Sequence, residues 1–267
     1  MEYPIPYYLL ITAAVVLGAV VGSFLNVVIL RLPASMLGAA ENIIWPASRC
    51  PQCKTSLAWY DNIPIVSFVL LRRRCRACGG KISWRYPLVE AAMAGLALAL
   101  LLRFGPTLDW LIYFIFSAAL LAIFFIDLDH QLIPDVISLP GIAMGFAASF
   151  GLSGVTWPDA GLGIVLGGGT FYLVALGYSL ATGREGMGGG DIKLLAMLGA
   201  FLGWQALPFI ILASSLLGLV VGIGAMIRQG KGGRSVIPFG PFLITAAWLW
   251  LFFPEQIDQL WRLLFLP

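Results

Sequence analysis

The first long apolar segment of the chain spans residues 8–30, YLLITAAVVLGAVVGSFLNVVIL, and contains no charged side chain. As an α-helix, this segment of 23 residues would rise about 34 Å, which is enough to cross the roughly 30 Å hydrocarbon core of a bilayer. No basic residue precedes it, Arg31 follows it, and it is longer than the apolar region of a secretory signal peptide. The segment therefore predicts a membrane anchor and not a cleaved signal.

The whole chain is unusually apolar. Of its 267 residues, 60% are hydrophobic and 11% are charged, against about 25% charged in ordinary soluble domains. A water-soluble globule is excluded because there are too few polar side chains to cover a compact core. We therefore expect an all-α polytopic membrane protein with about eight transmembrane helices. Besides residues 8–30, these helices are expected at residues 86–102, 110–126, 136–152, 162–181, 192–202 (short, so sheltered by its neighbours), 206–227 and 239–253.

The distribution of lysine and arginine predicts the orientation in the membrane. Nine of the sixteen lie in residues 31–85, and five more lie in residues 184–193 and 228–234. Cytoplasmic segments carry such an excess, so the N-terminus should lie outside the cytoplasmic (inner) membrane and residues 32–85 should lie in the cytoplasm. The net charge of +3 is spread over several loops, which predicts contact with membrane lipid but no nucleic-acid partner.

All four cysteines lie in residues 32–85, as Cys50-Pro-Gln-Cys53 and Cys75-Arg-Ala-Cys78, with 21 residues between the pairs. This spacing is typical of four-thiolate zinc sites. Two disulfides are the alternative, which a reducing cytoplasm disfavours. Four protein ligands leave no position for water or substrate, so the zinc would be structural. The expected organisation is a first transmembrane helix (residues 1–31), a cytoplasmic zinc-binding loop domain (32–85) and a seven-helix membrane domain (86–267).

Two clusters of carboxylates interrupt the apolar pattern at helix ends. Asp127 ends the third expected helix, in the sequence FIDLDHQLIPD, and Asp191 begins the sixth, in GMGGGDIK. Both fall at the expected cytoplasmic boundary, so they can meet although 64 positions separate them (191 − 127). Two carboxylates a few ångströms apart share one proton, so one is a base toward water and the other an acid toward a carbonyl group. The pair predicts an aspartyl protease, in which Gly188 and Gly190 would let the loop backbone approach a partner closely.

Other polar residues near these aspartates have simpler interpretations. Three further carboxylates are either solvated at the membrane boundary or attract a basic substrate electrostatically. They are Asp129, Asp135 and Glu185. His130 is expected to be a loop residue, and Lys193 is expected to point away from the nearby aspartate. Two other classes of function stay open. A proton-coupled transporter also places carboxylates in broken helices, and a membrane scaffold could use its zinc loop to bind a secretion partner.

Seven motifs occur in order along nearly the whole chain. They are GSFLNVVILRLP (residues 22–33), CPQC (50–53), WYDNIPIVS (59–67), CRAC (75–78), ISWRYPLVE (82–90), FIDLDHQLIPD (125–135) and GMGGGDIKLLAMLGA (186–200). Together they resemble the type IV prepilin peptidases, a family of GxGD intramembrane aspartyl proteases that also methylate their product. The resemblance implies that Asp127 and Asp191 are the catalytic aspartates and that the four cysteines bind zinc.

The resemblance also implies a substrate and a cofactor. The family removes a short basic leader from type IV prepilins or type II secretion pseudopilins at the cytoplasmic face, and then N-methylates the new N-terminus with S-adenosylmethionine. The chain differs from many members at Arg73, where glycine is common, and in a shorter linker between residues 33 and 50. No glycine-rich strand-to-helix turn marks an S-adenosylmethionine pocket. Glu90 is the candidate residue for methyl transfer in this part of the chain.

Overall fold

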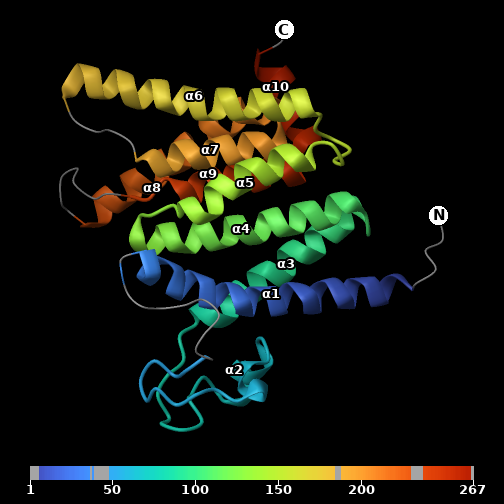
Figure 1. Ribbon diagram of the computed structural model, residues 1–267, viewed down its shortest axis with the longest axis vertical. Coiled ribbons are helices and arrows are strands. Elements are labelled where there is room, and N and C mark those ends of the chain that lie inside the picture. The colour runs from blue at the N-terminus through green and yellow to red at the C-terminus, as the bar shows by residue number, and fades with distance from the viewer. Residues whose placement is uncertain (1–5, 37, 39–47, 184–187, 230–236, 266–267) are drawn as a thin grey trace. The chain divides into compact units, whose positions relative to one another are not determined.

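The computed structural model describes residues 6–36, 38, 48–183, 188–229 and 237–265 (Figure 1). These residues form α-helices and short turns, with two isolated bridges and no β-strand among them. The helices are α1 (Tyr7–Met36), α2 (Val66–Leu70), α3 (Arg85–Phe104), α4 (Leu108–His130), α5 (Asp135–Ala148), α6 (Trp157–Thr182), α7 (Gly189–Leu202), α8 (Leu207–Gln229), α9 (Gly240–Phe252) and α10 (Pro254–Phe265), with 3₁₀ turns η1 (Trp59–Asn62) and η2 (Trp204–Ala206).

The predicted all-α membrane architecture is confirmed. Each of the eight expected apolar segments contains a helix, although α5 ends at Ala148, before the expected end at residue 152. Within the described ranges five helices are long and apolar enough to cross a membrane: α1, α3, α4, α6 and η2 continuing into α8. The other three, α5, α7 and α9, have 14, 14 and 13 residues. Residues 194–202 of α7 are all buried, so protein and not lipid surrounds most of this short helix.

The chain forms two compact units, Met1–Ala122 and Ile123–Pro267. In the first unit, α1 packs along α3 because glycines let the two backbones approach. A Cβ added to Gly18 would lie 2.7 Å from the Cα of Ala94, and one added to Gly22 would lie 2.7 Å from the Cα of Glu90. The helices are also joined by Asn26, whose side-chain amide donates to the carbonyl of Tyr86 at 3.1 Å.

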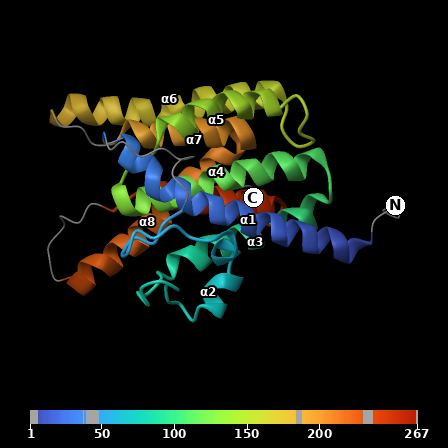
Figure 2. The same ribbon diagram turned by 60° about the horizontal axis from the view of Figure 1, so that its bottom comes forward.

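In the second unit, α7 packs against both α5 and α6, as Figure 2 shows. The contact with α6 is closest at Gly163 and Gly199, where a Cβ on either residue would overlap the backbone of the other. The contact with α5 places Gly141 against Met197, whose Sδ would lie 2.6 Å from an added Cβ. These small residues fix α7, and the residue at its N-terminus, against the rest of the unit.

The helix α10 was not among the predicted helices. It begins at Pro254, directly after the last expected apolar segment, and carries the ion pair Asp258–Arg262 at 2.7 Å. Its apolar residues lie on one side of the helix and its charged residues on the other. An amphipathic helix has a low average hydropathy, so a search for long apolar segments does not detect it.

Candidate functional site

Asp127 lies in the last turn of α4 and is only 5% exposed. Its carboxylate oxygen Oδ2 accepts a 3.0 Å hydrogen bond from the backbone N–H of Gly240, the first residue of α9. The chain turns sharply just beyond Asp127, because Gln131 adopts a left-handed conformation (φ 52°) and Pro134 precedes α5. The end of α4 therefore holds a buried carboxylate against the start of another helix.

Asp191 lies in the first turn of α7, close enough to Asp127 for the two carboxylates to interact electrostatically. The segments meet around Ile133, in the turn between α4 and α5. A Cβ on Gly190 would lie 2.9 Å from the Cβ of Ile133, and a Cβ on Gly240 would lie 3.4 Å from its Cδ1. The fold thus brings together two aspartates that are 64 positions apart (191 − 127).

The glycines before α7 are not equivalent. Gly190 is needed for the close approach to Ile133, whereas a Cβ on Gly188 would meet nothing within 4 Å. The backbone of Gly188 has an ordinary φ of −68°, so nothing in the structure explains a glycine there. Glu185 lies outside the described residues.

Two of the neighbouring charged residues pair with each other. Lys193 donates to both carboxylate oxygens of Asp135 at 2.7 Å, which fixes the start of α5 to the first turn of α7. The expectation that Lys193 points away from Asp191 is consistent with this pair. Asp129 and His130 are both exposed at the end of α4.

Gly240 is a site residue that the sequence reasoning missed. A Cβ at this position would lie 2.6 Å from Oδ2 of Asp127, closer than a carbon and an oxygen can approach without a shift. The N-terminus of a helix has unpaired N–H groups and a partial positive charge, which favour an anion. The sequence Pro-Phe-Gly-Pro at residues 238–241 could have indicated this residue, because it places a glycine near two prolines at the start of an apolar segment.

The four cysteines form a cluster in the first unit. Their sulfur atoms all lie within 4.8 Å of one another, with Cys50 Sγ 3.9 Å from Cys78 Sγ and Cys53 Sγ 4.0 Å from Cys75 Sγ. Sulfurs around a tetrahedral ion at bond lengths of about 2.3 Å are separated by about 3.8 Å. All four are free thiols, so the disulfide alternative is not the arrangement seen, and the cluster could hold a metal ion.

The two Cys-x-x-Cys turns have the same backbone design. In the first, the N–H of Lys54 donates to the carbonyl of Cys50, and in the second the N–H of Gly79 donates to that of Cys75, each at 2.9 Å. Both donors have a left-handed φ, 59° for Lys54 and 69° for Gly79. Hydrogen bonds from Thr55 lower the pKa of Cys53 to about 6, which favours the thiolate that binds metal.

The arginines beside the cysteines have other partners. The Arg76 guanidinium is paired with Asp61 at 2.8 Å, which raises the pKa of Arg76, and it lies 5.2 Å from the ring centre of Tyr60. Arg73 lies 5.6 Å from the Trp84 ring centre, and its backbone φ is 62°. Glycine adopts that left-handed conformation more readily than arginine does.

Glu90 lies in α3 and is 7% exposed. Its Oε2 accepts a 2.7 Å hydrogen bond from the backbone N–H of Ile65, and the hydroxyl of Ser23 also bonds to the carboxylate. These contacts tie α1, α3 and the segment before α2 together. Glu90 belongs to the same unit as the cysteine cluster.

Two family profiles match the chain. Residues 16–104 match the Bacterial Peptidase A24 N-terminal domain, and residues 114–223 match the Type IV leader peptidase family. Three similar proteins are named prepilin leader peptidase/N-methyltransferase. The Pseudomonas putida protein is 40% identical and the Stutzerimonas stutzeri protein 42% identical, each with 92% of both chains aligned. The Myxococcus xanthus protein is 44% identical, with 82% of this chain and 64% of the relative aligned. No solved structure matches the chain.

Proposed function

Because the chain belongs to the type IV leader peptidase family, we propose that it is a membrane aspartic peptidase that removes the leader of type IV prepilins or pseudopilins and N-methylates the new N-terminus. Asp127 and Asp191 are the catalytic pair. The observation that supports this assignment is the closeness of the two carboxylates. Asp127 accepts a hydrogen bond from the N–H of Gly240, and Asp191 is close enough to interact electrostatically with Asp127.

The two aspartates have different roles in peptide cleavage. The hydrogen bond from Gly240 stabilises negative charge on Asp127, so Asp127 is the base and Asp191 carries the proton of the pair. Asp127 takes a proton from water as the oxygen bonds to the scissile carbonyl carbon, while Asp191 protonates the carbonyl oxygen. When the tetrahedral intermediate collapses, the C–N bond breaks, the amine receives the proton from Asp127, and Asp191 recovers its own.

Leader removal and methyl incorporation can be measured separately on one preparation of the purified protein with a prepilin substrate in detergent. We expect a shortened pilin whose new N-terminus is methylated when S-adenosylmethionine, the methyl donor, is present. A folded protein that leaves the leader intact would contradict the peptidase assignment. Cleavage without methyl incorporation would contradict the methyltransferase assignment alone.

We propose that zinc occupies the cysteine cluster as a structural ion. The purified protein should contain about one zinc per chain, and Cys53→Ser should lose the metal and make residues 48–84 sensitive to protease, because metal-binding energy is folding energy in so small a unit. Ser56→Ala is the matched control, since Ser56 is exposed, lies in the same loop and is not one of the four clustered cysteines. A native protein that keeps a protected loop without any metal would overturn the zinc assignment.

We propose that the N-terminus and the turn after α5 lie on the outer side of the cytoplasmic membrane. The cysteine cluster lies on the opposite side, in the cytoplasm. Gly154→Cys and Val69→Cys test this orientation, because a Cβ on Gly154 would meet no atom within 4 Å and Val69 is 64% exposed. A membrane-impermeant maleimide should label position 154 in intact cells and position 69 only after the membrane is opened. Labelling of position 69 alone in intact cells would reverse the topology.

A further inference from the structure

The short helix α2 of the loop domain has an exposed apolar face. Val66, Val69 and Leu70 are 49%, 64% and 76% exposed, and their spacing of three and four residues places them on one side of the helix. Phe68 points elsewhere and packs against Trp84, with 5.0 Å between the ring centres. Large apolar side chains that stay exposed on one face of a helix indicate a surface that contacts a partner or a membrane.

The contacts of Glu90 place the start of α2 at membrane depth. The N–H of Ile65, the residue directly before α2, donates to Oε2 of Glu90 at 2.7 Å. Glu90 is the sixth residue of α3, a helix long and apolar enough to cross a membrane, so it lies about 7.5 Å beyond the start of that helix. The hydroxyl of Ser23, which bonds to the same carboxylate, lies seven residues before the end of the apolar segment 8–30, a rise of about 10 Å. Two membrane helices therefore place this contact inside the bilayer.

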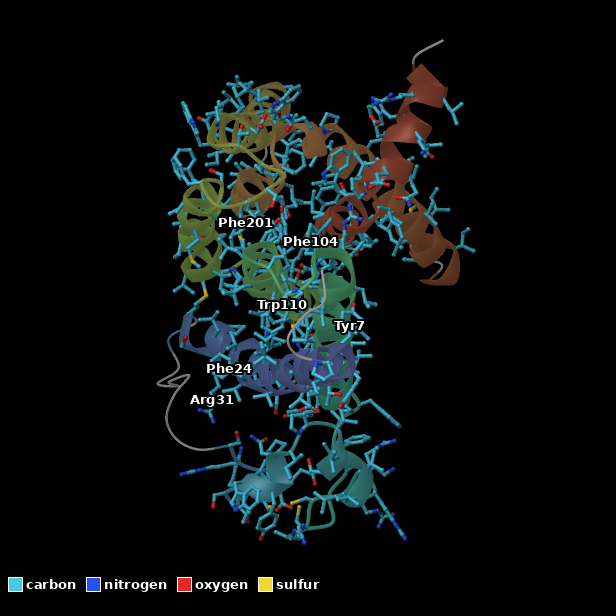
Figure 3. All side chains as sticks on the ribbon, turned by 90° about the vertical axis from the view of Figure 1, so that its right-hand side faces the viewer. Tyr7, Phe24, Arg31, Phe104, Trp110 and Phe201 are labelled. Carbon is cyan, nitrogen blue, oxygen red and sulfur yellow. The ribbon has the colours of Figure 1, made fainter. Side chains whose placement is uncertain are left out.

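The figures show the same arrangement within the first unit. In Figure 1, α2 is the part of the loop domain that reaches farthest along α1 toward the N-terminal end of that helix. Figure 3, turned by 90°, shows the loop domain again below α1, with the Arg31 side chain extending from α1 on that side. The helix α2 therefore lies beside the membrane helices and not beyond their ends.

The backbone around α2 forms its own hydrogen bonds, as a segment in contact with lipid has to do. Carbonyl groups three to five residues earlier accept the N–H groups of Ser67, Val69, Leu71, Arg72, Arg73 and Arg74. The chain turns directly after α2, because Arg72 and Arg73 have left-handed φ angles of 47° and 62°. These N–H groups are satisfied within the segment, so it can contact acyl chains without losing hydrogen bonds to water.

Basic and aromatic side chains border the apolar face. Arg72 and Arg74 are exposed, and the Arg73 guanidinium lies 5.6 Å from the ring centre of Trp84. Trp84 directly precedes α3 and is 63% exposed, which is the usual position of a tryptophan at the membrane interface. Long basic side chains beside an apolar face keep their stems in the apolar layer and their charges among lipid phosphates. This chemistry fits a lipid surface.

We propose that α2 inserts into the cytoplasmic leaflet of the membrane, with Val66, Val69 and Leu70 among the acyl chains and Arg72 and Arg74 among the phosphates of anionic lipids. The choice of leaflet rests on the orientation in the proposed function, whereas the insertion rests on contacts within the first unit. The loop domain is then bound to the membrane surface and is not a domain surrounded by water.

Leu70→Cys and Ser56→Cys compare α2 with the first cysteine-bearing turn. Both residues are exposed, so a water-soluble maleimide would reach both in a loop domain surrounded by water. The purified variants are placed in nanodiscs of phosphatidylcholine and phosphatidylglycerol, which leave both membrane faces open to the reagent. We expect Leu70→Cys to react at least about ten-fold more slowly than Ser56→Cys, and both to react in sodium dodecyl sulfate. Position 69, on the same face, should likewise react only after detergent dissolves the bilayer.

Peptide mass spectrometry assigns the label, and wild-type resistance of the loop domain to protease shows that each variant is folded. If Leu70→Cys fails to fold, Val66→Cys tests the same face. Equal labelling rates of the α2 and Ser56→Cys variants in nanodiscs would overturn the insertion of α2. Protection in membranes from cells but not in nanodiscs would identify a protein partner at α2 and would also overturn it. Neither result depends on the proposed orientation or on peptidase activity, because the reagent reaches both faces of a nanodisc.

The role of the arginines is tested by lipid charge. Leu70→Cys should react at least about five-fold faster in nanodiscs of phosphatidylcholine alone, because each arginine near an anionic surface strengthens binding by about that factor. Adding Arg72→Gln and Arg74→Gln should remove this difference. Adding Arg49→Gln should preserve it, since the exposed Arg49 forms a bridge with Ser56. Equal protection of Leu70→Cys in both kinds of nanodisc would show that the arginines do not bind anionic lipid.

Discussion

Asp127→Asn and Asp191→Asn should each lower the rate of leader cleavage by several orders of magnitude, while the protein still inserts into the membrane and folds. Asparagine preserves the side-chain volume but cannot share a proton, so either change leaves the pair without a base or without an acid. The rate should be measured with purified variants and a prepilin in detergent. Methyl transfer to an already cleaved pilin should persist, because that reaction needs neither carboxylate.

Asp129→Asn is the matched control for these variants. It removes a carboxylate from an exposed position two residues beyond Asp127 on the same helix, and we expect it to retain most of the cleavage activity. If Asp129→Asn abolished cleavage and Asp127→Asn did not, the catalytic position on α4 would have been assigned incorrectly.

Gly240→Ala should lower the rate of leader cleavage by about a hundred-fold or more, because displacements near 1 Å in an active site have effects of that size. The added Cβ would lie 2.6 Å from Oδ2 of Asp127, so the carboxylate must move or lose its hydrogen bond. We expect Gly240 to act by positioning the carboxylate of Asp127, so the loss should appear in kcat with little change in KM.

Gly224→Ala provides the comparison for Gly240. Gly224 lies in α8, and a Cβ there would meet no atom within 4 Å, so this variant should cleave as the wild type does. Wild-type kcat in a folded Gly240→Ala protein would show that the start of α9 does not position Asp127.

The sequence predicted the features that depend on local pattern. The lengths of the apolar segments located all eight membrane-associated helices, because a helix inside a bilayer needs a continuous run of apolar side chains around its hydrogen-bonded backbone. The Cys-x-x-Cys spacing predicted the cluster of four sulfurs, since each turn can place both of its thiols on one ion. The meeting of Asp127 and Asp191 was anticipated because both lie at helix ends expected at the same membrane face.

Features that depend on tertiary contacts were not predictable in this way. The hydrogen bond from Gly240 to Asp127 joins positions that are 113 residues apart, and glycine alone does not reveal what its backbone will approach. The hydrogen bond from Ile65 to Glu90 requires α3 and the loop domain to lie side by side. The helix α10 was missed because its alternation of charged and apolar residues lowers its average hydropathy.

The most direct test of the central claim is a double-mutant cycle on leader cleavage, comparing Asp127→Asn, Asp191→Asn and the double variant under single-turnover conditions. Two carboxylates that share one proton act as a unit, so their effects should be strongly non-additive. We predict that the double variant cleaves nearly as fast as either single variant. If the fold-decrease in the cleavage rate of the double variant equals the product of the fold-decreases of the two single variants, the aspartates act independently. The account of a shared-proton pair would then be wrong.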